Sequence, residues 1–475
     1  MGHCWVGGGG AGRYGTAVRV PAYHLPAIEP ELDIEWRRVE GVEVGLPRLR
    51  PEQLHTAIEH AKAASRALCA RAVDDVLETL DRVISRWLDP NGDWLQRAGE
   101  VLPATTGFSP AMIRHALPLL IAPLRAENVR VLLRTELGDH RVLDGVHRGR
   151  WACSPNLITH VLSGNIPGLS ATSAVLTLAV KSAALMKTAT GDVVFPALFA
   201  SSIAALDPAA GKCLLVTHWP GGEHALEEIA FAEADVVVAS GSDAAIAAIQ
   251  RRVRGRFIGH GHKVSFAAIG KEEIASAEDA RALARRLAYD VSVWDQQGCL
   301  SPQLCYVERG GGVTPEEFAQ LLGEALAEYA TELPPRRLGF EERAAVQRFR
   351  QEAEWRGDKL ITSSESTDWT VTVEHDARFL PTCLNRCVRL QVVESIAVLA
   401  DVLRPQRTQL EAAGLACAAD RFASFAEMLI TSGVRRICHI GTMQQPPLSW
   451  RQGGRPRVAE WVEWAEVEEP VSSSR

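Results

Sequence analysis

Hydrophobic residues recur every three or four positions between residues 51 and 139, and this spacing predicts a series of amphipathic helices. The clearest run is "LHTAIEHAKAASRALCARAVDDVLETLDRVISRWL". Helix-breaking residues at Pro90-Asn91-Gly92, Pro103 and Pro110 divide the region. Residues 25–50 are rich in proline and are predicted to be extended. Residues 51–139 are therefore expected to be mainly helical.

From residue 157 the pattern changes to short apolar runs that alternate with helical segments. The predicted strands are "NLITHVLSG", "SAALMKTA", "KCLLVTHW" and "ADVVVASG", and a second set contains "KVSFAAIG", "PQLCYVE", "WTVTVEHD" and "VRLQVVES". Strands that alternate with helices of this length form parallel, doubly wound sheets. Ligands of such sheets bind beyond the carboxyl ends of the strands.

Three further stretches lie outside this alternation. Residues 140–155, "HRVLDGVHRGRWACSP", predict a hairpin around Asp144-Gly145, and residues 457–469, "RVAEWVEWAEVEE", predict a strand with an acidic tail. Residues 7–12, "GGGGAG", match the spacing of glycines in a dinucleotide-binding motif but lack its structural context. No strand precedes them and no apolar helix follows, so a flexible start is expected.

Composition narrows the class of protein. The 475 residues are 47% hydrophobic and 23% charged, which suits two or three globular domains. The net charge of −7 and the lack of a long basic block argue against nucleic acid as the main partner. No signal peptide is expected, and Lys181 interrupts the most apolar stretch, residues 168–187, so no membrane span is expected.

The cysteines indicate a reduced, cytoplasmic protein. Ten are spread over the chain without any CxxC pair. Cys383 and Cys387 lie four apart, but no second pair of ligands has suitable spacing. His260 and His262 have no acidic or cysteine ligands near them in sequence. No metal site is therefore expected.

Three predicted strand ends in the first sheet carry residues that can reach a ligand. Asn165, in "LSGNIPG", can donate a hydrogen bond into the cleft or bond its own backbone. Lys187, in "LMKTATGD", can reach a phosphate or ribose or remain a solvated rim residue. Gly241-Ser242 joins a strand to a helix N-terminus, which favours a pyrophosphate, although such turns cap many helices without a ligand.

"WDQQGCLSPQ", residues 294–303, contains the candidate nucleophile, Cys299. A free thiol is most often a core residue. Gly298, Ser301 and Pro302 indicate a loop at this point instead, whereas Cys305 lies in a predicted buried strand. A cysteine hydrolase is disfavoured because no His-Asp pair lies near the loop in sequence.

The order of these motifs resembles the aldehyde dehydrogenase superfamily. Within it, "SGNIPGLS", "VVASGSDAAI" and "WDQQGCLSPQ" resemble the acyl-CoA reductases of bacterial luciferase operons, the LuxC family, over residues 150–440. The resemblance implies an α/β, aldehyde-dehydrogenase-like fold with two doubly wound, Rossmann-like domains. It divides the chain into a helical region and NADP-binding domain over 1–263, a catalytic domain over 264–439 and a C-terminal oligomerisation tail over 440–475. The 140–153 hairpin and the tail would form an arm of a homo-oligomer.

The resemblance also implies roles for single residues. Cys299 would be the nucleophile, with Asn165 and the backbone N–H of Cys299 as the oxyanion hole. Lys187 would contact the adenosine ribose, and Gly241 and Ser242 the pyrophosphate. The implied reaction is reduction of a long-chain acyl-CoA or acyl-carrier thioester to the aldehyde through an acyl-cysteine, with an acyl-protein synthetase as a partner in luminescent relatives.

Three positions depart from the superfamily pattern. The glutamate that activates water in hydrolytic members falls at Gly259, so an acyl-cysteine should resist hydrolysis. The acid that holds the ribose hydroxyls in NAD-preferring members falls at Thr190, which favours NADPH. The glutamate that holds the nicotinamide ribose has no match in "CLNRCVRLQVV". An NAD-dependent hydrolytic aldehyde dehydrogenase and a catalytically degenerate acyl-binding scaffold therefore remain alternatives.

Overall fold

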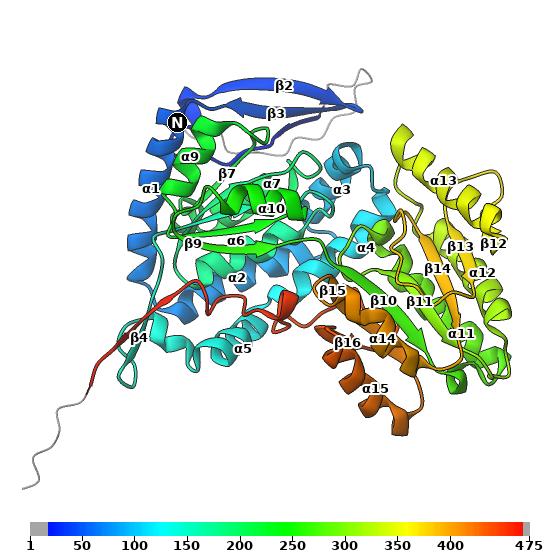
Figure 1. The fold of residues 1–475 in the computed structure, drawn as a ribbon. Helices are drawn as coiled ribbons and strands as arrows, with labels where there is room; N and C mark the ends of the chain where they lie inside the picture. Colours follow the sequence, from blue (N-terminus) through cyan, green and yellow to red (C-terminus); the bar gives the residue numbers. More distant parts are fainter. Residues whose placement is uncertain (1–17, 469–475) are drawn as a thin grey trace, which may run out of the picture.

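The computed structural model describes residues 18–468, which form two α/β bodies beside each other (Figure 1). Strands from residues 157–260 build the sheet of one body, and strands from residues 264–438 build the sheet of the other. Residues 261–263 lead from the first body to the second. After the last strand of the second sheet, the chain returns to the first body, where the Arg256 guanidinium donates to the carbonyl oxygen of Glu460 at 2.8 Å.

The first sheet is fully parallel and has the strand order β7-β6-β5-β8-β9. Its strands are β5 (Leu157–Val161), β6 (Ala183–Lys187), β7 (Leu214–Thr217), β8 (Val236–Ser240) and β9 (Arg256–His260). The order runs outward in both directions from β5, so the sheet is doubly wound. Its helices are α6 (Leu169–Ala179), α7 (Phe195–Leu206), α8 (Pro208–Gly211), α9 (His224–Ala232) and α10 (Asp243–Gln250).

Five helices precede this sheet in the chain. They are α1 (Pro51–Cys69), α2 (Val73–Leu88), α3 (Asp93–Thr106), α4 (Pro110–Ile121) and α5 (Ala126–Leu137). In α2 the buried apolar positions follow the helical spacing from Val73 to Trp87. The prediction of helices in this region is confirmed.

The second sheet has the order β12-β13-β14-β11-β10-β15-β16, and its edge strand β12 is antiparallel. Its strands are β10 (Val264–Ile269), β11 (Pro302–Glu308), β12 (Lys359–Thr362), β13 (Thr370–Glu374), β14 (Cys387–Val393), β15 (Leu410–Ala416) and β16 (Arg436–Cys438). Its helices are α11 (Ala277–Ser292), α12 (Pro315–Glu332), α13 (Phe340–Arg356), α14 (Leu399–Leu403) and α15 (Ala419–Thr431). Every residue of β10, β11 and β14 is buried, because helices cover both faces of a parallel sheet.

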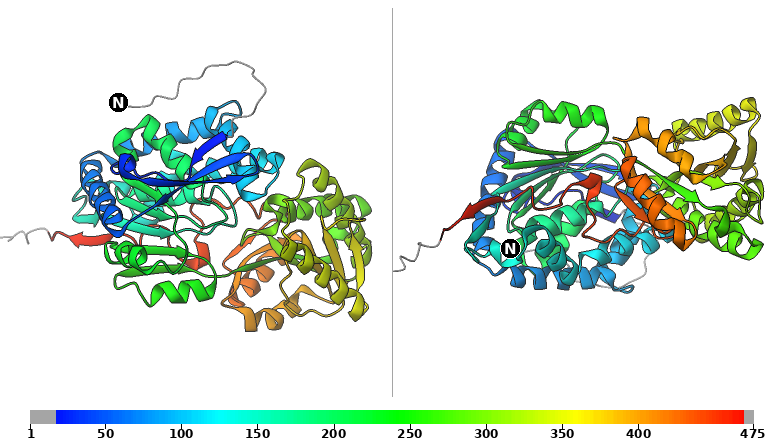
Figure 2. Two further views of the ribbon diagram at one scale, coloured as in Figure 1. Left: turned by 90° about the horizontal axis from the view of Figure 1, so that it is seen from above. Right: turned by 60° about the horizontal axis from the view of Figure 1, so that its bottom comes forward.

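Two small sheets complete the structure. β1 (Val18–Pro21), β2 (Asp33–Val39) and β3 (Val42–Arg48) lie over the first body, as the view from above shows (Figure 2). β4 (Arg150–Cys153) pairs with β17 (Glu463–Glu466) in an antiparallel ribbon that points away from the first body. The expected hairpin over 140–153 is wrong in its pairing. Residues His140–Leu143 form a 3-10 helix, capped by Asp139, and β4 takes its partner from the C-terminal segment.

The remaining short elements are 3-10 helices: η1 (Glu29–Glu31), η2 (Ala122–Leu124), η3 (His140–Leu143), η4 (Lys271–Ile274), η5 (Val293–Gln296), η6 (Ile396–Val398), η7 (Arg404–Gln406) and η8 (Gln452–Gly454). Within residues 18–468, no helix has the length and apolar character needed to cross a bilayer. The glycine run at 7–12 lies outside the described residues.

Candidate active site

The predicted site residues gather where the carboxyl ends of the first sheet meet the second body. Asn165 follows β5, Lys187 ends β6, and Gly241-Ser242 follows β8. In the strand order, β5 and β8 are neighbours from which the chain winds in opposite directions. A doubly wound sheet opens a crevice at this point, and ligands bind there.

Cys299 lies in a short turn between η5 and β11. The Ser265 hydroxyl donates to the Cys299 carbonyl oxygen at 2.6 Å, and the same oxygen atom of Ser265 accepts the Ala412 N–H at 3.1 Å. Behind the turn, the Gln444 side chain donates to the Ser301 hydroxyl at 3.1 Å. Three segments that are distant in sequence therefore fix the backbone of the candidate nucleophile.

Asn165 reaches this turn from the other body. Its side-chain amide donates a hydrogen bond to the carbonyl oxygen of Gln297, two residues before Cys299. A Cβ atom on Gly298 would lie 3.1 Å from Cδ1 of Ile166, so the two loops are in close contact. Since an NH₂ group has two hydrogens, Asn165 retains one donor for a ligand. The structure thus brings Asn165 and the Cys299 turn together.

The approach to Cys299 is built from two left-handed turns. Residues 294–296 and residues 384–386 have positive φ angles between 49° and 63°. This left-handed conformation costs free energy for any residue other than glycine, and it persists only where neighbouring contacts hold it. Asn385 N–H donates to the Asp295 carbonyl oxygen at 3.2 Å, and the Asn385 side chain accepts from Gln297 at 3.1 Å. The two turns hold each other in place.

The surroundings of the Cys299 thiol keep it protonated. Cys299 is half-buried and packs against a small cluster of Leu300, Ala412 and Met443. Burial, followed by the carboxylate of Glu411, raises the pKa of Cys299 to about 12, although Arg457 and Lys263 oppose the shift. Burial favours the neutral form of a thiol, so Cys299 is protonated before any attack.

Glu411 and Arg457 are two charged residues close enough to affect the Cys299 thiol. Glu411 is almost fully buried and accepts the Gly453 N–H at 2.8 Å, and burial raises the pKa of its carboxyl. Arg457 donates to the Trp450 carbonyl oxygen at 3.0 Å, and burial lowers the pKa of its guanidinium. Both residues depend on the C-terminal segment that returns from the second body.

Lys187 ends β6, and Thr190 lies in the loop that follows it at the carboxyl edge of the first sheet. Lys187 is half-buried, and burial lowers the pKa of its ammonium group. Thr190 is exposed. His218, at the end of β7, lies 3.3 Å from the Thr188 hydroxyl, and the sequence argument missed it. Lys187 and His218 thus lie at the ends of neighbouring strands, at the same edge of the sheet as Thr190.

Gly241 and Ser242 lead into α10. The Ser242 hydroxyl accepts the Ala245 N–H at 3.2 Å, so Ser242 is the N-cap of this helix. None of the eight residues of α10 is buried, which leaves the helix and its first turn open to a ligand. A Cβ on Gly259 would lie 2.7 Å from Cγ2 of Ile246, so this position has no room for a side chain.

The candidate metal ligands do not form a larger cluster. Within the described residues, no group of three or more His, Cys, Asp or Glu side chains is placed to hold a metal ion. Burial lowers the pKa of His260 to about 4, whereas His262 is exposed. Cys383 is half-buried and Cys387 is buried.

A protein-family comparison now bears on this geometry. The family model described as acyl-CoA reductase (LuxC) matches residues 68–454. The chain belongs to this family. The resemblance inferred from the glycine, asparagine and cysteine motifs is confirmed.

Named relatives agree with the family. Long-chain acyl-protein thioester reductases from Photorhabdus luminescens and Aliivibrio fischeri are each 27% identical to the chain, over 329 and 324 residues. Each match covers 65% of this chain and 66% of the relative. The chain therefore matches about two thirds of the length of these relatives.

Solved structures confirm the aldehyde-dehydrogenase-like fold. Aldehyde dehydrogenase 21 from Physcomitrella patens, in complex with succinate, superimposes with a TM-score of 0.70 at 14% identity and covers 93% of this chain and 96% of its own. NADP-dependent glyceraldehyde-3-phosphate dehydrogenase from Bacillus halodurans C-125, in complex with NADP, has a TM-score of 0.66 at 14% identity, with 86% and 87% covered. At this identity the likeness shows the fold alone.

Several residues of the site were not identified from the sequence. Ser265, Glu411, Trp450 and Arg457 come from three segments remote from "WDQQGCLSPQ", and no local pattern marks them. Only His218 had a usable signal, since it follows an apolar strand in "LLVTHW" as Lys187 follows "AALM".

Proposed function

We propose that this protein reduces an acyl thioester to the aldehyde with a nicotinamide cofactor, through an acyl group carried on Cys299. One observation supports this most directly. The Cys299 turn is in hydrogen-bond contact with Asn165, so a thiol and a free amide donor flank the same crevice. The names of the relatives, which are acyl-protein thioester reductases, support the substrate class.

The acyl transfer to Cys299 is a thioester exchange. The sulfur of Cys299 bonds to the acyl carbon, the bond from that carbon to the donor sulfur breaks, and the Cys299 proton ends on the departing thiol. Because the thiolate is the nucleophile and burial raises the pKa of the resting Cys299 to about 12, loss of the Cys299 proton is part of the exchange, and that proton neutralises the departing thiolate. Asn165 and the Cys299 N–H would stabilise the tetrahedral oxyanion, at about 3 kcal/mol per donor.

The residues of the first sheet suit a nicotinamide dinucleotide. The α10 N-terminus after Gly241 and Ser242 can hold the pyrophosphate, and Lys187 can hold the adenosine ribose. NADPH is favoured because the exposed Thr190 carries no charge to repel a 2′-phosphate. When bound, the cofactor supplies the two electrons that reduce the acyl-cysteine, after which Cys299 is released with the aldehyde.

Hydrolysis of the acyl-cysteine is disfavoured by the space around Gly259. With Ile246 only 2.7 Å from a Cβ there, β9 cannot carry a carboxylate at this position without moving α10. Water near the thioester then lacks the base that hydrolytic members use.

The acyl chain can occupy an apolar groove whose lining includes the segment between Met443 and Trp450. The groove has a volume of about 380 Å³ and runs between Leu119, Pro123 and Val131 on one side and residues 445–449 on the other. Met443 and Trp450, which flank this segment, belong to the cluster around Cys299. Val131→Trp should shorten the accepted chain, whereas Val398→Trp, at another exposed valine, should not.

The central test uses purified protein, NADPH and acyl-CoA thioesters of several chain lengths. We expect NADPH consumption with equal aldehyde formation, and an acyl adduct on the intact protein in the absence of NADPH. Cys299→Ala should lose both, whereas Cys438→Ala, a thiol of the same cluster, should keep both. Turnover by Cys299→Ala, or carboxylic acid as the product, would contradict the proposal.

Cofactor binding has its own measurement. Calorimetry should show tighter binding of NADPH than of NADH, and Lys187→Ala should weaken both. Equal affinity for NADPH and NADH would contradict the cofactor preference without affecting the reaction class.

Two proposals concern partners. The β4–β17 ribbon exposes Trp151 and Trp464, so we expect it to be the arm of a homo-oligomer, and Trp464→Glu should lower the mass seen by light scattering. The relatives' names point to an acyl-protein donor, and an acyl-protein synthetase should transfer its acyl group to Cys299 in a mixed assay.

A further inference from the structure

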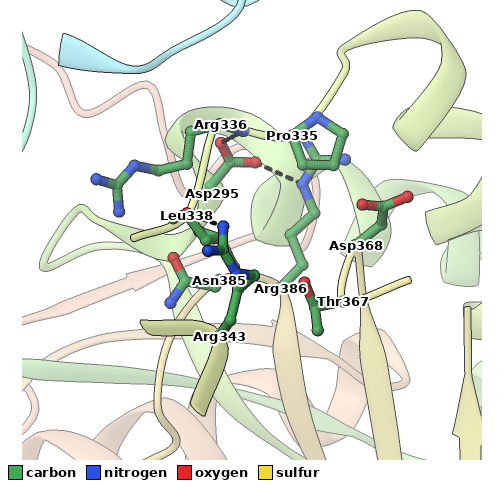
Figure 3. A pocket seen from close by; sticks show the side chains of 9 residues that line it. All are labelled: Asp295, Pro335, Arg336, Leu338, Arg343, Thr367, Asp368, Asn385 and Arg386. Atoms are coloured by element: carbon green, nitrogen blue, oxygen red, sulfur yellow. Dashed lines mark hydrogen bonds and ion pairs between the residues drawn. The ribbon is translucent and has the colours of Figure 1, made fainter. Parts of the chain in front are cut away.

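A second cavity lies in the second body, next to Asp295 of η5. Its volume is about 170 Å³, room for five or six water-sized groups at about 30 Å³ each. The lining residues are Asp295, Pro335, Arg336, Leu338, Arg343, Thr367, Asp368, Asn385 and Arg386. Figure 3 shows Arg343 and Arg386 beneath Asp295, with Asn385 on one side and Thr367 and Asp368 on the other.

The arginines of this cavity have donors to spare. Arg386 is fully buried; its Nε donates to Asp295 at 2.6 Å and its Nη2 to the Leu333 carbonyl oxygen at 2.6 Å. Its Nη1 and the Nε of Arg336 are buried without a partner among the described residues. A buried N–H without an acceptor is costly, so these groups call for a ligand with acceptor oxygens.

Arg343 adds an exposed charge to the wall. It extends from the first turn of α13, and within residues 18–468 it forms no ion pair within 4.0 Å. Its guanidinium bonds the Leu338 carbonyl oxygen at 2.5 Å. The other two arginines are already paired, Arg336 with Glu342 and Arg386 with Asp295. Arg343 is therefore the charge that remains available to an anion.

The cavity is within reach of Cys299. Asp295 and Cys299 are four residues apart, so their Cα atoms can be at most about 14 Å apart. A pantetheine arm, with two amide units between its phosphate and its sulfur, spans roughly five extended residues, about 17 Å. A thioester bonded at Cys299 can thus place its phosphate among these arginines.

We propose that this arginine cavity binds the phosphate of a phosphopantetheine-type acyl donor, an inference that rests on the proposed acyl-thioester reduction. Arg343 would hold the phosphate oxygens, because guanidinium groups bind phosphate in bidentate geometry, and the unpaired N–H groups of Arg386 and Arg336 lie buried behind the cavity wall. The phosphate can belong to coenzyme A or to the phosphodiester of a carrier protein, since both have the same group at the end of the arm.

Asp368 provides a second, opposite test of this assignment. Its carboxylate also lines the cavity and forms no ion pair with a described residue. This carboxylate would repel a phosphate, so it should lower the affinity of the cavity for coenzyme A. Replacing it by asparagine should strengthen binding, whereas loss of Arg343 should weaken it.

The experiment compares Arg343→Gln, Asp368→Asn and the control Arg348→Gln, an exposed arginine of α13 outside the cavity. Calorimetry with coenzyme A and with inorganic phosphate needs no turnover. Rates are measured with acyl-CoA, acyl-phosphopantetheine and acyl-pantetheine, the last of which lacks phosphate. Arg343 and Arg348 are exposed and Asp368 is half-buried, and thermal unfolding reports the folding of all three variants.

We expect Arg343→Gln to weaken coenzyme A binding and kcat/KM for acyl-CoA about tenfold, with no change for acyl-pantetheine. An equal loss of kcat/KM with acyl-phosphopantetheine would mean that Arg343 binds the phosphate that coenzyme A shares with a carrier protein. A loss confined to acyl-CoA would mean that Arg343 binds the phosphates of the nucleotide part of coenzyme A. Unchanged coenzyme A binding in Arg343→Gln, the same loss with acyl-pantetheine, or an Arg343 effect on inorganic phosphate alone would overturn the proposal. Arg343-dependent binding of coenzyme A without turnover would instead count against the proposed reaction.

Discussion

The hydroxyl of Ser265 donates a 2.6 Å hydrogen bond to the backbone carbonyl oxygen of Cys299. Ser265 is the second residue of β10 and is fully buried, and its oxygen also accepts the Ala412 N–H from β15. One hydroxyl thus ties the nucleophile turn to two central strands of the second sheet. The orientation of Cys299 is set by the sheet rather than by its own loop.

Ser265→Ala should therefore affect both stability and turnover. Two buried backbone groups lose their partner, at about 1–3 kcal/mol each in free energy of unfolding. We also expect a fall in kcat of about tenfold, because a small displacement of the nucleophile slows its attack. Ser292→Ala is the matched control, since the Ser292 hydroxyl is equally buried but has no partner among the described residues. Equal behaviour of the two variants would contradict a positioning role for Ser265.

Asn165→Asp should reduce turnover without affecting folding. Aspartate has the same shape but cannot donate a hydrogen bond, and its charge would oppose an oxyanion. Removal of one such donor usually lowers kcat by about 10²–10³. Asn165 is exposed, so the unfolding midpoint should stay within the error of the measurement. Ser163→Ala, in the same loop, should keep its activity; a kcat for Asn165→Asp within twofold of the parent would remove Asn165 from the oxyanion hole.

Alkylation of Cys299 should show no plateau at moderate pH. Because the pKa of Cys299 is raised to about 12, the thiolate fraction should grow about tenfold per pH unit from pH 7 to about 10. The rate of Cys299 alkylation by iodoacetamide, measured by peptide mapping, should rise by the same factor as the thiolate fraction. Cys383 offers an internal comparison, because its contact with Cys387 lowers its pKa and should bring an earlier plateau. A Cys299 rate that levels off below pH 8 would show that the thiol is activated at rest.

Asp290 should make the protein less stable as the pH rises. Burial raises the pKa of this carboxyl to about 7, although it accepts the Met443 N–H at 3.0 Å. Between about pH 4 and pH 7 the folded state keeps a proton that the unfolded chain releases, so the free energy of unfolding falls across this window. The loss is on the order of 4 kcal/mol.

Asp290→Asn should flatten that part of the pH profile. Chemical denaturation at pH 5 and pH 8 measures the difference, and the parent protein is the reference. Asp192, whose pKa burial likewise raises to about 7, should still contribute its own slope. Parallel profiles for the parent and Asp290→Asn would mean that Asp290 is ionised throughout.

Part of this structure follows from local pattern. The secondary structure of α2, β10 and β11 could be predicted from the sequence. Apolar residues recur every three or four positions in a helix with one buried face, and they form a short continuous run in a strand that is buried on both faces. Cys299 was distinguished from Cys305 by its glycine, serine and proline neighbours, which exclude a strand. Strand ends in a doubly wound sheet share one edge, so Asn165, Lys187 and Ser242 could be assigned to one side of the molecule from the sequence.

Other features depend on contacts between distant segments. The hairpin expected around Asp144-Gly145 failed because β4 pairs with β17, which lies more than three hundred residues away in the chain. The left-handed residues 294–296 have no glycine to mark them, and only residues 384–386 hold them in that conformation.

The sequence by itself determined the two α/β domains, the family and the identity of the candidate nucleophile, since these depend on periodicity and on short motifs within one segment. Only the tertiary structure decided the protonation of Cys299, its anchoring by Ser265 and the arginine cavity next to its loop. Protonation and cavity shape depend on which charges and apolar groups surround a site, and here Glu411, Arg457 and Arg343 come from segments far from Cys299 in the chain. No spacing within a single stretch of sequence encodes such distances.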